Sequence, residues 1–194
     1  MKDKKSEIFQ CGKEIFKEKG FKDTNISDIT KMAGIGVGTF YSYYSSKEEL
    51  FLDIYISENK KEKNKILESL DVNKDPVSFV KEFMTRTFDA MHSNKILKEW
   101  YNRDVFKKLE KAFEKNPQAA NESMRNFFVN LLKQWKEDGK IRNDINDELL
   151  AAFFDSLAYI DSHKEDIGIQ HFPEIMQYLV EFIMKGLTDK GGSE

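Results

Sequence analysis

The sequence predicts an all-α protein. Apolar residues recur at spacings of three and four positions in one segment after another, which is the period of a helix that buries one face. Alternation of apolar and polar residues, the pattern of a half-buried strand, is rare, and the 194 residues include only three prolines. The segments end at glycines, at Asn-Pro or Asp-Pro pairs, or in short polar runs. We expect nine to ten helices in total.

The first helix is predicted over residues 6–19. Its apolar positions lie at helical spacing, and Gly20 ends it. These positions are Ile8, Phe9, Ile15 and Phe16. Cys11 lies near the same side, and we interpret it as a small core residue, because a single cysteine excludes an intramolecular disulfide.

Two short helical patterns, separated by a glycine turn, follow this helix. Thr24 or Asn25 can cap the first, and Gly34 supplies the permissive backbone of a sharp bend. The second begins near Val37 and turns Phe40 inwards. Its outward positions are Gly38, Thr39, Ser42 and Tyr43. This layout is typical of a helix-turn-helix, although periodicity alone does not distinguish it from an ordinary helical corner.

Six further helical patterns fill the chain after residue 46. They are predicted over about 47–70, 76–92, 95–115, from the Asn116-Pro117 break to 138, 145–164 and 172–188. Whether the third of these is one helix or two that meet near Asn102 stays open. Asp75 can cap the second, because proline at the next residue suits the first helical position. The tail 189–194 is predicted to be disordered.

The last two helices carry doubled rows of apolar residues. A helix that covers one core needs a single apolar stripe, so the additional row predicts burial on a second side, against another subunit. The residues assigned to this dimer interface are Leu150, Phe153, Phe154, Leu157, Ile175, Leu179, Phe182 and Ile183. An internal helix of a monomer is the alternative interpretation.

The middle helices contain more aromatic residues than a bundle of this size requires. For any single residue, a place in a packed core is the simplest interpretation. As a set, these residues are also typical of an apolar cavity that binds a flat or hydrophobic ligand. The predicted pocket residues are Phe83, Met84, Thr87, Phe88, Met91, Trp100, Tyr101, Phe127, Leu131 and Trp135.

Composition and motif spacing argue against an enzyme and against a membrane protein. We find no Glu-x-x-His pair, phosphate-binding glycine loop, nucleophile elbow or zinc-site spacing, so we predict no catalytic residue, no metal and no cofactor. Apolar runs of about 18 residues and a signal-peptide core are absent, which predicts a cytoplasmic protein without membrane contact. The net charge is −3. Residues 1–50 hold nine basic and eight acidic side chains, and residues 51–194 hold 22 basic and 26 acidic side chains.

The segment from Gly20 to Phe51 strongly resembles the amino-terminal part of bacterial transcriptional repressors of the TetR family. The shared features are the Gly20-Phe21 pair, Thr24, Ile29, Ala33-Gly34, Gly38-Thr39-Phe40-Tyr41, Tyr44 and Lys47-Glu48-Glu49-Leu50-Phe51. Beyond residue 60 only the length and the helical layout are similar. The resemblance implies a three-helix helix-turn-helix DNA-binding domain over 1–46, with its motif at about 25–44, and a helical ligand-binding and dimerisation domain over 47–188.

The resemblance also implies which residues meet DNA. They are Thr24, Asn25, Ser27, Gly36, Val37, Gly38, Thr39, Tyr41, Ser42, Tyr43 and Lys47. Glycines would let the backbone approach the major groove, Tyr41 and Tyr43 would bring hydroxyls to phosphates, and Lys47 would pair with a phosphate. The alternatives are that Tyr41 belongs to the core and that Lys47 is a solvated charge. Gly36 and Val37 depart from the family's pattern, in which serine or threonine and lysine are frequent, so two polar contacts are missing.

By the same resemblance, we expect a homodimeric repressor that binds a palindromic double-stranded DNA operator and is nucleoid-associated when bound. An apolar or aromatic small-molecule inducer would bind between the long helix after residue 46 and the helices that follow. Two recognition helices must enter successive major grooves about 34–36 Å apart, and a ligand that tilts the long helix would change this distance. A helical adaptor that acts through a protein partner is the alternative.

Overall fold

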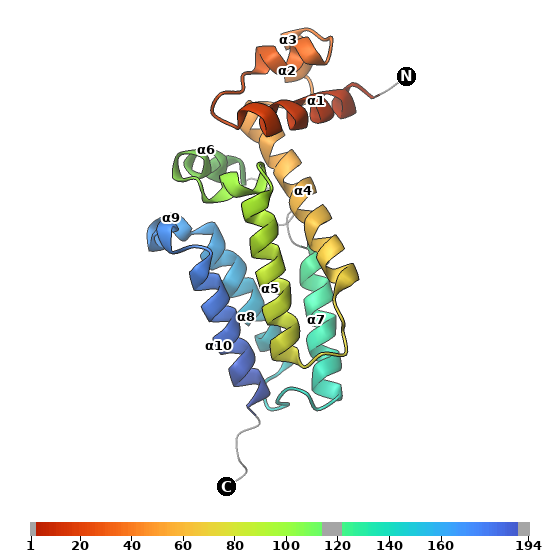
Figure 1. Cartoon of the computed structure of the whole chain (residues 1–194), viewed down its shortest axis with the longest axis vertical. Coiled ribbons are helices and arrows are strands. Elements are labelled where there is room, and N and C mark those ends of the chain that lie inside the picture. The colour runs from red at the N-terminus through yellow and green to blue at the C-terminus, as the bar shows by residue number, and fades with distance from the viewer. Residues whose placement is uncertain (1–2, 114–121, 190–194) are drawn as a thin grey trace. The chain divides into compact units, whose positions relative to one another are not determined.

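The computed structural model describes residues 3–113 and 122–189 (Figure 1). These residues form ten α-helices and two short 3-10 helices, without a strand among them, so the prediction of an all-α fold is confirmed. The predicted Asn116-Pro117 break and residues 190–194 of the predicted tail lie outside the described residues. None of the described helices combines the length and the apolar character that crossing a membrane requires.

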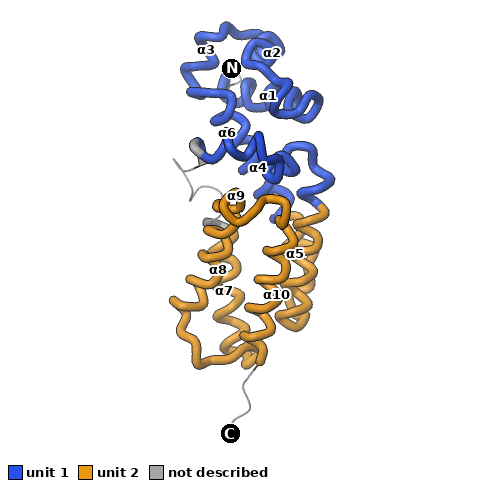
Figure 2. Tube along the Cα trace, turned by 90° about the vertical axis from the view of Figure 1, so that its left-hand side faces the viewer, with its two compact units in different colours: residues 1–63, 90–117 blue, residues 64–89, 118–194 orange. Residues whose placement is uncertain are grey.

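The chain divides into two compact units (Figure 2). Unit 1 comprises residues 1–63 and 90–117, and unit 2 comprises residues 64–89 and 118–194. Helix α4 (Lys47–Ser69) therefore begins in unit 1 and ends in unit 2, whereas α5 (Pro76–Ser93) begins in unit 2 and ends in unit 1. The functional boundary at residue 46 stays a prediction, because a division by contacts does not show which part binds DNA.

Unit 1 contains the three amino-terminal helices and the first part of α4, and an aromatic core joins α1 to α4. These helices are α1 (Lys4–Lys19), α2 (Ile26–Met32) and α3 (Val37–Tyr41). The rings of Phe16, Phe21 and Phe51 lie 4.9–6.1 Å apart and are almost completely buried. Further along α4, Tyr55 stacks on Trp100 at 4.8 Å. Aromatic packing in unit 1 thus extends along α4, from α1 to the segment that follows α5.

Helix α1 lies unusually close to α4 because of a glycine. A Cβ atom at Gly12 would stand 2.8 Å from Leu50 Cδ2 on α4, closer than real Cβ contacts allow. Asp3 caps α1 by accepting a hydrogen bond from the Lys5 amide, and Gly20 ends it with φ +80°. Cys11 beside Gly12 is half-buried, and this burial raises the pKa of its thiol.

Unit 2 is a helical bundle with a second aromatic core. Besides most of α5 it contains α7 (Glu122–Glu137), α8 (Asp147–Ser162), α9 (Lys164–Ile167), η2 (Ile169–His171) and α10 (Glu174–Thr188). Phe83 of α5 meets Phe128 of α7 edge to face at 5.0 Å, and Phe128 stacks on Phe154 of α8 at 6.2 Å. One line of rings thus joins three helices of the bundle.

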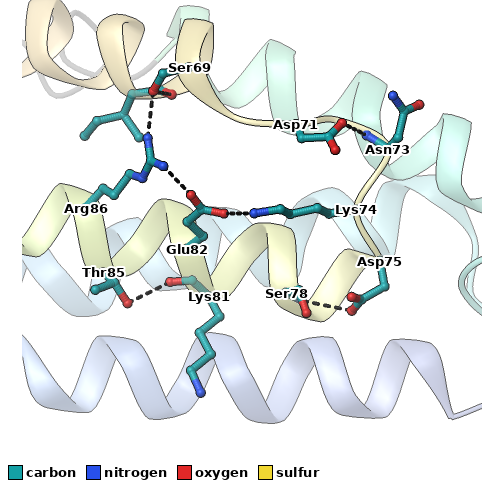
Figure 3. A network of polar contacts seen from close by, with 11 residues as sticks. Ser69, Asp71, Asn73, Lys74, Asp75, Ser78, Lys81, Glu82, Thr85 and Arg86 are labelled. Carbon is teal, nitrogen blue, oxygen red and sulfur yellow. Dashed lines mark hydrogen bonds and ion pairs between the residues drawn. The ribbon is translucent and has the colours of Figure 1, made fainter.

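Polar contacts hold the turn between α4 and α5 within unit 2 (Figure 3). The Glu82 carboxylate accepts hydrogen bonds from Lys74 in the turn and from Arg86 one turn further along α5. Arg86 also donates to Ser69 Oγ at 2.8 Å, which connects α5 to the end of α4. Asp75 accepts from the Ser78 amide at 2.9 Å, so the predicted cap of α5 is confirmed.

The structure decides the question left open at residues 95–115. The segment forms two elements, the 3-10 helix η1 (Leu97–Tyr101) and α6 (Arg103–Phe113). Asn102 between them has an extended backbone with ψ 111°, and its carbonyl accepts from the amides of Val105 and Phe106, so it ends one element and starts the next. The apolar periodicity continues across this break, which is why periodicity could not locate it.

Candidate nucleic-acid interface

Helices α2 and α3 form a helix-turn-helix with a tightly bonded turn. Asn25 caps α2 by accepting a hydrogen bond from the Asp28 amide at 2.8 Å. Gly34 has φ +63°, a conformation that favours glycine, and lets the Ile35 amide reach the Thr30 carbonyl at 3.0 Å. The turn places the start of α3 immediately after the bend, as the glycine in the sequence predicts.

Helix α3 and the three residues after it separate an apolar inner side from an exposed outer side. Phe40 and Tyr44 are buried, at 0% and 3% exposure, and Tyr44 donates to Asp53 Oδ2 on α4 at 2.8 Å. In contrast, Val37, Tyr41 and Tyr43 are 46%, 54% and 38% exposed. The interpretation of Tyr41 as a core residue is therefore wrong, and its ring only borders Phe40, with the two centroids 5.5 Å apart.

The fold gives no internal reason for the glycines at the start of α3. Gly36 has φ −77°, and neither Gly36 nor Gly38 has a positive φ. Within the described part of the chain, a Cβ atom at either position would meet nothing within 4 Å. Both backbones are thus open to solvent and could be approached closely by another molecule.

Two of the residues implied to meet DNA are used inside the protein instead. The Thr24 side chain is 2% exposed and donates from its hydroxyl to the Gly20 carbonyl at 2.7 Å, so its assignment as a side-chain contact is wrong. The Lys47 ammonium donates to the carbonyls of Phe21 and Thr24 at 2.8 and 2.6 Å, and burial lowers the pKa of Lys47. The Thr24 side chain closes the connection between α1 and α2 on itself, and the Lys47 side chain holds this connection against the start of α4.

The remaining implied contacts lie on the outside of the helix-turn-helix. Ser27 and Ser42 are exposed, and the Ser42 hydroxyl donates to the Gly38 carbonyl at 3.2 Å. Thr39 is half-buried, and Asn25 is exposed, although its side-chain oxygen is engaged in the cap. Met32 is 49% exposed near the turn and is not among the predicted contacts, although it follows the buried Ile29 by three positions and so repeats the apolar spacing of α2.

The charge of the two units differs much more than the charge of the two ends of the chain. Unit 1 holds 19 basic and 15 acidic residues, a balance of +4, and unit 2 holds 12 and 19, a balance of −7. Residues 90–117 alone contribute seven basic and four acidic residues. Division at residue 50 concealed this asymmetry, because a basic segment distant in sequence belongs to the same unit as the helix-turn-helix. A positive unit favours a polyanionic partner.

The predicted ligand residues are distributed over both units. Met91, Trp100 and Tyr101 belong to unit 1, where Trp100 is packed between Tyr55 and Phe106. The unit 2 members include two buried polar atoms, Thr87 Oγ1 and Trp135 Nε1, that lack a hydrogen-bond partner among the described residues. A separate groove of about 80 Å³ on unit 2 shares only Met84 with the predicted set. Its apolar lining residues are Val77, Val80, Met84, Val180 and Met184.

The predicted dimer residues fall on two different sides of α8 and α10. Leu150 and Leu157 are 2% and 7% exposed and belong to the core of unit 2 itself. Phe182 is 62% exposed. The half-buried members are Phe153, Phe154, Ile175, Leu179 and Ile183. Tyr159 and Tyr178, which the doubled apolar rows did not single out, are 64% and 59% exposed on the same two helices.

Comparison with known proteins connects this geometry to a family. The family model described as "Bacterial regulatory proteins, tetR family" matches residues 8–54, which contain α1, α2, α3 and the start of α4. The HTH-type transcriptional repressor KstR2 of Mycobacterium tuberculosis is 20% identical over 196 residues, covering 97% of this chain and 94% of that protein. The uncharacterized HTH-type regulator YvdT of Bacillus subtilis is 49% identical over 47 residues, 24% of each chain.

Solved structures agree with this assignment at the level of the fold. The FadR repressor of Thermus thermophilus, crystallised with lauroyl-CoA, has a TM-score of 0.61 at 18% identity and covers 98% of both chains. FadR of Bacillus subtilis, crystallised with stearoyl-CoA, has a TM-score of 0.56 at 14% identity, covering 94% of this chain and 98% of that one. The relatives named here are regulators and not enzymes. Residues 8–54 are thus identified as a helix-turn-helix domain of the TetR family of bacterial transcriptional regulators, and the protein is a DNA-binding regulator.

Proposed function

We propose that this regulator is a repressor that binds a palindromic operator as a homodimer and leaves it when a small apolar molecule binds. The observation that carries the proposal is the outer side of α3, where two glycines without an internal role stand beside exposed tyrosines. Backbone amides that can approach closely and tyrosine hydroxyls are both suited to contact phosphates and base edges at a major groove. The residues that would meet DNA are the implied contacts without the Thr24 side chain, and Lys47 would act by holding the α1–α2 connection.

Operator binding is tested on the DNA upstream of the chain's own gene. Footprinting should protect two half-sites whose centres lie about one helical turn, or a multiple of it, apart. Binding should weaken steeply with salt and exceed binding to a duplex of scrambled sequence. Equal affinity for both duplexes, or none for either, would instead support the helical adaptor that acts through a protein partner.

Dimerisation is supported by the exposed aromatic side chains of α8 and α10. Tyr159, Tyr178 and Phe182 are each about 60% exposed, and the rings of Tyr178 and Phe182 lie 6.1 Å apart. Large exposed apolar groups on neighbouring helices are typical of a surface that another subunit covers. Sedimentation of the purified chain at micromolar concentration should give twice its mass of 22.7 kDa. A single species at the protomer mass would contradict the homodimer.

The ligand would bind in the apolar interior of the carboxy-terminal helices. The aromatic rings of unit 2, together with the unpartnered Thr87 and Trp135 atoms, provide apolar walls and polar groups that a ligand could satisfy. Because two structural neighbours were crystallised with acyl-CoA thioesters, this ligand class is the first to test.

Ligand response is measured by adding lauroyl-CoA or stearoyl-CoA to the protein–operator complex. A ligand that favours the released state should weaken operator affinity roughly 5- to 150-fold, which corresponds to a coupling of about 1–3 kcal/mol. By linkage, the operator should weaken ligand binding by the same factor. Independent binding of ligand and operator would exclude the thioester as inducer.

We place the protein in the bacterial cytoplasm, where it associates with the nucleoid through its operator.

A further inference from the structure

A buried carboxylate in unit 1 joins three elements of that unit. Glu58 lies on α4, and only 3% of its surface is exposed. Its Oε1 lies 2.5 Å from Lys13 Nζ on α1, and its Oε2 accepts a hydrogen bond from Asn94 Nδ2, at 3.4 Å, in the turn after α5. Lys17, one turn further along α1, places its ammonium 3.6 Å from Oε2. We call Glu58, Lys13, Lys17 and Asn94 the Glu58 cluster.

Burial makes the charge of Glu58 depend on its partners. Burial alone would raise the pKa of this carboxyl group, but the hydrogen bonds from Lys13 and Asn94 and the nearby ammonium charges outweigh it, so the pKa lies below its usual value. A buried carboxylate that loses its partner remains uncompensated, which is strongly unfavourable. The ionised group therefore favours arrangements in which α1 and the turn after α5 both reach it.

The two main partners of Glu58, Asn94 and Lys13, are held in place in different ways. The Asn94 side-chain oxygen accepts from the amides of Ile96 at 2.9 Å and Leu97 at 3.3 Å, which begin η1. The same amide group thus caps η1 and donates to Glu58, so its place is determined by the backbone. Lys13 directly follows Gly12, whose backbone packs against Leu50 of α4. The cluster therefore sits where α1 meets α4.

The apolar core and the Glu58 cluster restrict α1 in different ways. Contacts among Phe16, Phe21 and Phe51 are non-directional, so they keep α1 against α4 but tolerate small rotations. A short charge-assisted pair between groups at defined positions permits one arrangement. In some proteins buried polar or ionic groups select a single arrangement of the elements that they join.

We propose that Glu58 is a positioning residue that fixes the orientation of the three amino-terminal helices on α4 and thereby sets the half-site spacing that the dimer accepts. This inference rests on the proposed function, since only a dimer on a two-part operator has a spacing to select. Each base pair inserted between half-sites moves one of them by about 3.4 Å and turns it by about 35°. If the contact between α1 and α4 is rigid, the helix-turn-helix cannot follow this movement. If the contact is loosened, the helix-turn-helix can adjust to the altered spacing.

The experiment compares operators that differ only in the distance between half-sites. The natural operator, found by footprinting, is remade with one base pair inserted or deleted at its centre. Affinities are measured for the wild-type protein and for Glu58→Gln, which keeps the size of the side chain and removes its charge. Lys17→Gln is the matched control, because it removes one charge from an exposed partner in the same cluster. Melting curves verify that each variant is folded.

Wild type should bind the operator of natural spacing more tightly than the altered operators. In Glu58→Gln, the ratio of the affinity for the natural operator to that for an altered operator should be roughly fivefold or more lower than in wild type, since about fivefold is the lower end of usual coupling effects. Lys17→Gln should keep the wild-type ratio, since exposed ion pairs contribute little. A change in stability alone would lower affinity for all operators equally and leave the ratio unchanged. If Glu58→Gln does not fold, Lys13→Gln breaks the same pair from its more exposed side and should lower the ratio.

Three results would overturn the inference. They are an unchanged ratio in the folded Glu58 or Lys13 variant, an equal fall in Lys17→Gln, and a wild type that binds specifically but without a spacing preference. A wild type that binds no DNA specifically would overturn the proposed function, and the inference with it. Specific binding by wild type together with an unchanged ratio in the variant separates the two failures.

Discussion

The glycine at position 38 provides a direct test of how α3 is used. Gly38 lies in the first turn of α3 with no positive φ, and in the described residues a Cβ atom there would meet nothing within 4 Å. The protein's own packing therefore accepts alanine. If α3 lies against DNA, however, the added methyl group would separate the backbone from a phosphate or a base edge. The substitution Gly38→Ala should thus affect stability and DNA binding in opposite directions.

The gain in stability follows from helix propensity. Alanine is favoured over glycine within a helix by about 0.5–1 kcal/mol, because glycine loses more conformational freedom on folding. For a chain of this length, a gain of 1 kcal/mol raises the melting temperature by roughly 2–4 °C. We therefore expect Gly38→Ala to melt about 1–4 °C above wild type.

The loss in DNA binding follows from displaced contacts. Hydrogen bonds to charged groups such as phosphates contribute about 1.5–3 kcal/mol. Loss of one such contact would weaken operator binding roughly 10- to 100-fold. Fluorescence anisotropy with a labelled operator at fixed salt measures this change, and differential scanning fluorimetry measures the melting temperature on the same samples.

Two other glycines serve as controls. Gly186 lies on α10, where an added Cβ atom also meets nothing among the described residues, so Gly186→Ala should gain stability. Because Gly186 follows Phe182 by four positions on the face proposed for the dimer, sedimentation verifies that the variant is dimeric, and its operator affinity should then equal that of wild type. Gly12→Ala should lose stability, because its Cβ atom would be 2.8 Å from Leu50 Cδ2. If Gly38→Ala gains stability and binds the operator as tightly as wild type, the glycine has no role in close approach to DNA, and the reasoning about α3 is refuted.

Three further predictions concern the dimer, the α1–α2 connection and acid stability. Phe182→Glu should give protomers in sedimentation with an unchanged circular dichroism spectrum, because this side chain is 62% exposed in the protomer; a dimer of the variant would exclude this face. Lys47→Met should lower the free energy of unfolding by about 1–2 kcal/mol in chemical denaturation, since the Phe21 and Thr24 carbonyls lose a charged donor. An unchanged free energy of unfolding would instead support Lys47 as a phosphate contact. The folded pKa of Glu58 lies below its unfolded value, so its contribution is present above about pH 4.3 and is lost as pH falls through the folded pKa. Glu58→Gln should therefore melt less pH-dependently than wild type between about pH 5 and 3, and parallel curves would contradict the ion pair.

The helix-turn-helix could be predicted from the sequence because its determinants are local. The Asn25 cap, the left-handed Gly34 and the inward Phe40 lie within about two turns of one another, and each acts through its immediate neighbours. The all-α fold could be predicted for the same reason, since helical periodicity needs only one face of each segment to be apolar.

The outward side of α8 and α10 could not be predicted from the sequence. Both helices carry apolar residues on two sides, and composition does not distinguish the side that faces its own core from the side left open. Leu157 and Tyr159 are two positions apart on α8, yet one is 7% and the other 64% exposed. That difference depends on where the neighbouring helices lie, which is a property of the whole bundle.

The sequence by itself therefore determined the class of fold, the position of the helix-turn-helix and the resemblance of this segment to the TetR family, because these depend on short-range spacing. Only the tertiary structure decided the roles of polar side chains whose partners are distant in sequence. Lys47 bonds to carbonyls more than 20 residues away, and Glu58 meets Lys13 and Asn94 from opposite directions along the chain. Hydrogen bonds and ion pairs require atoms within about 3–4 Å, and folding alone brings such distant residues that close.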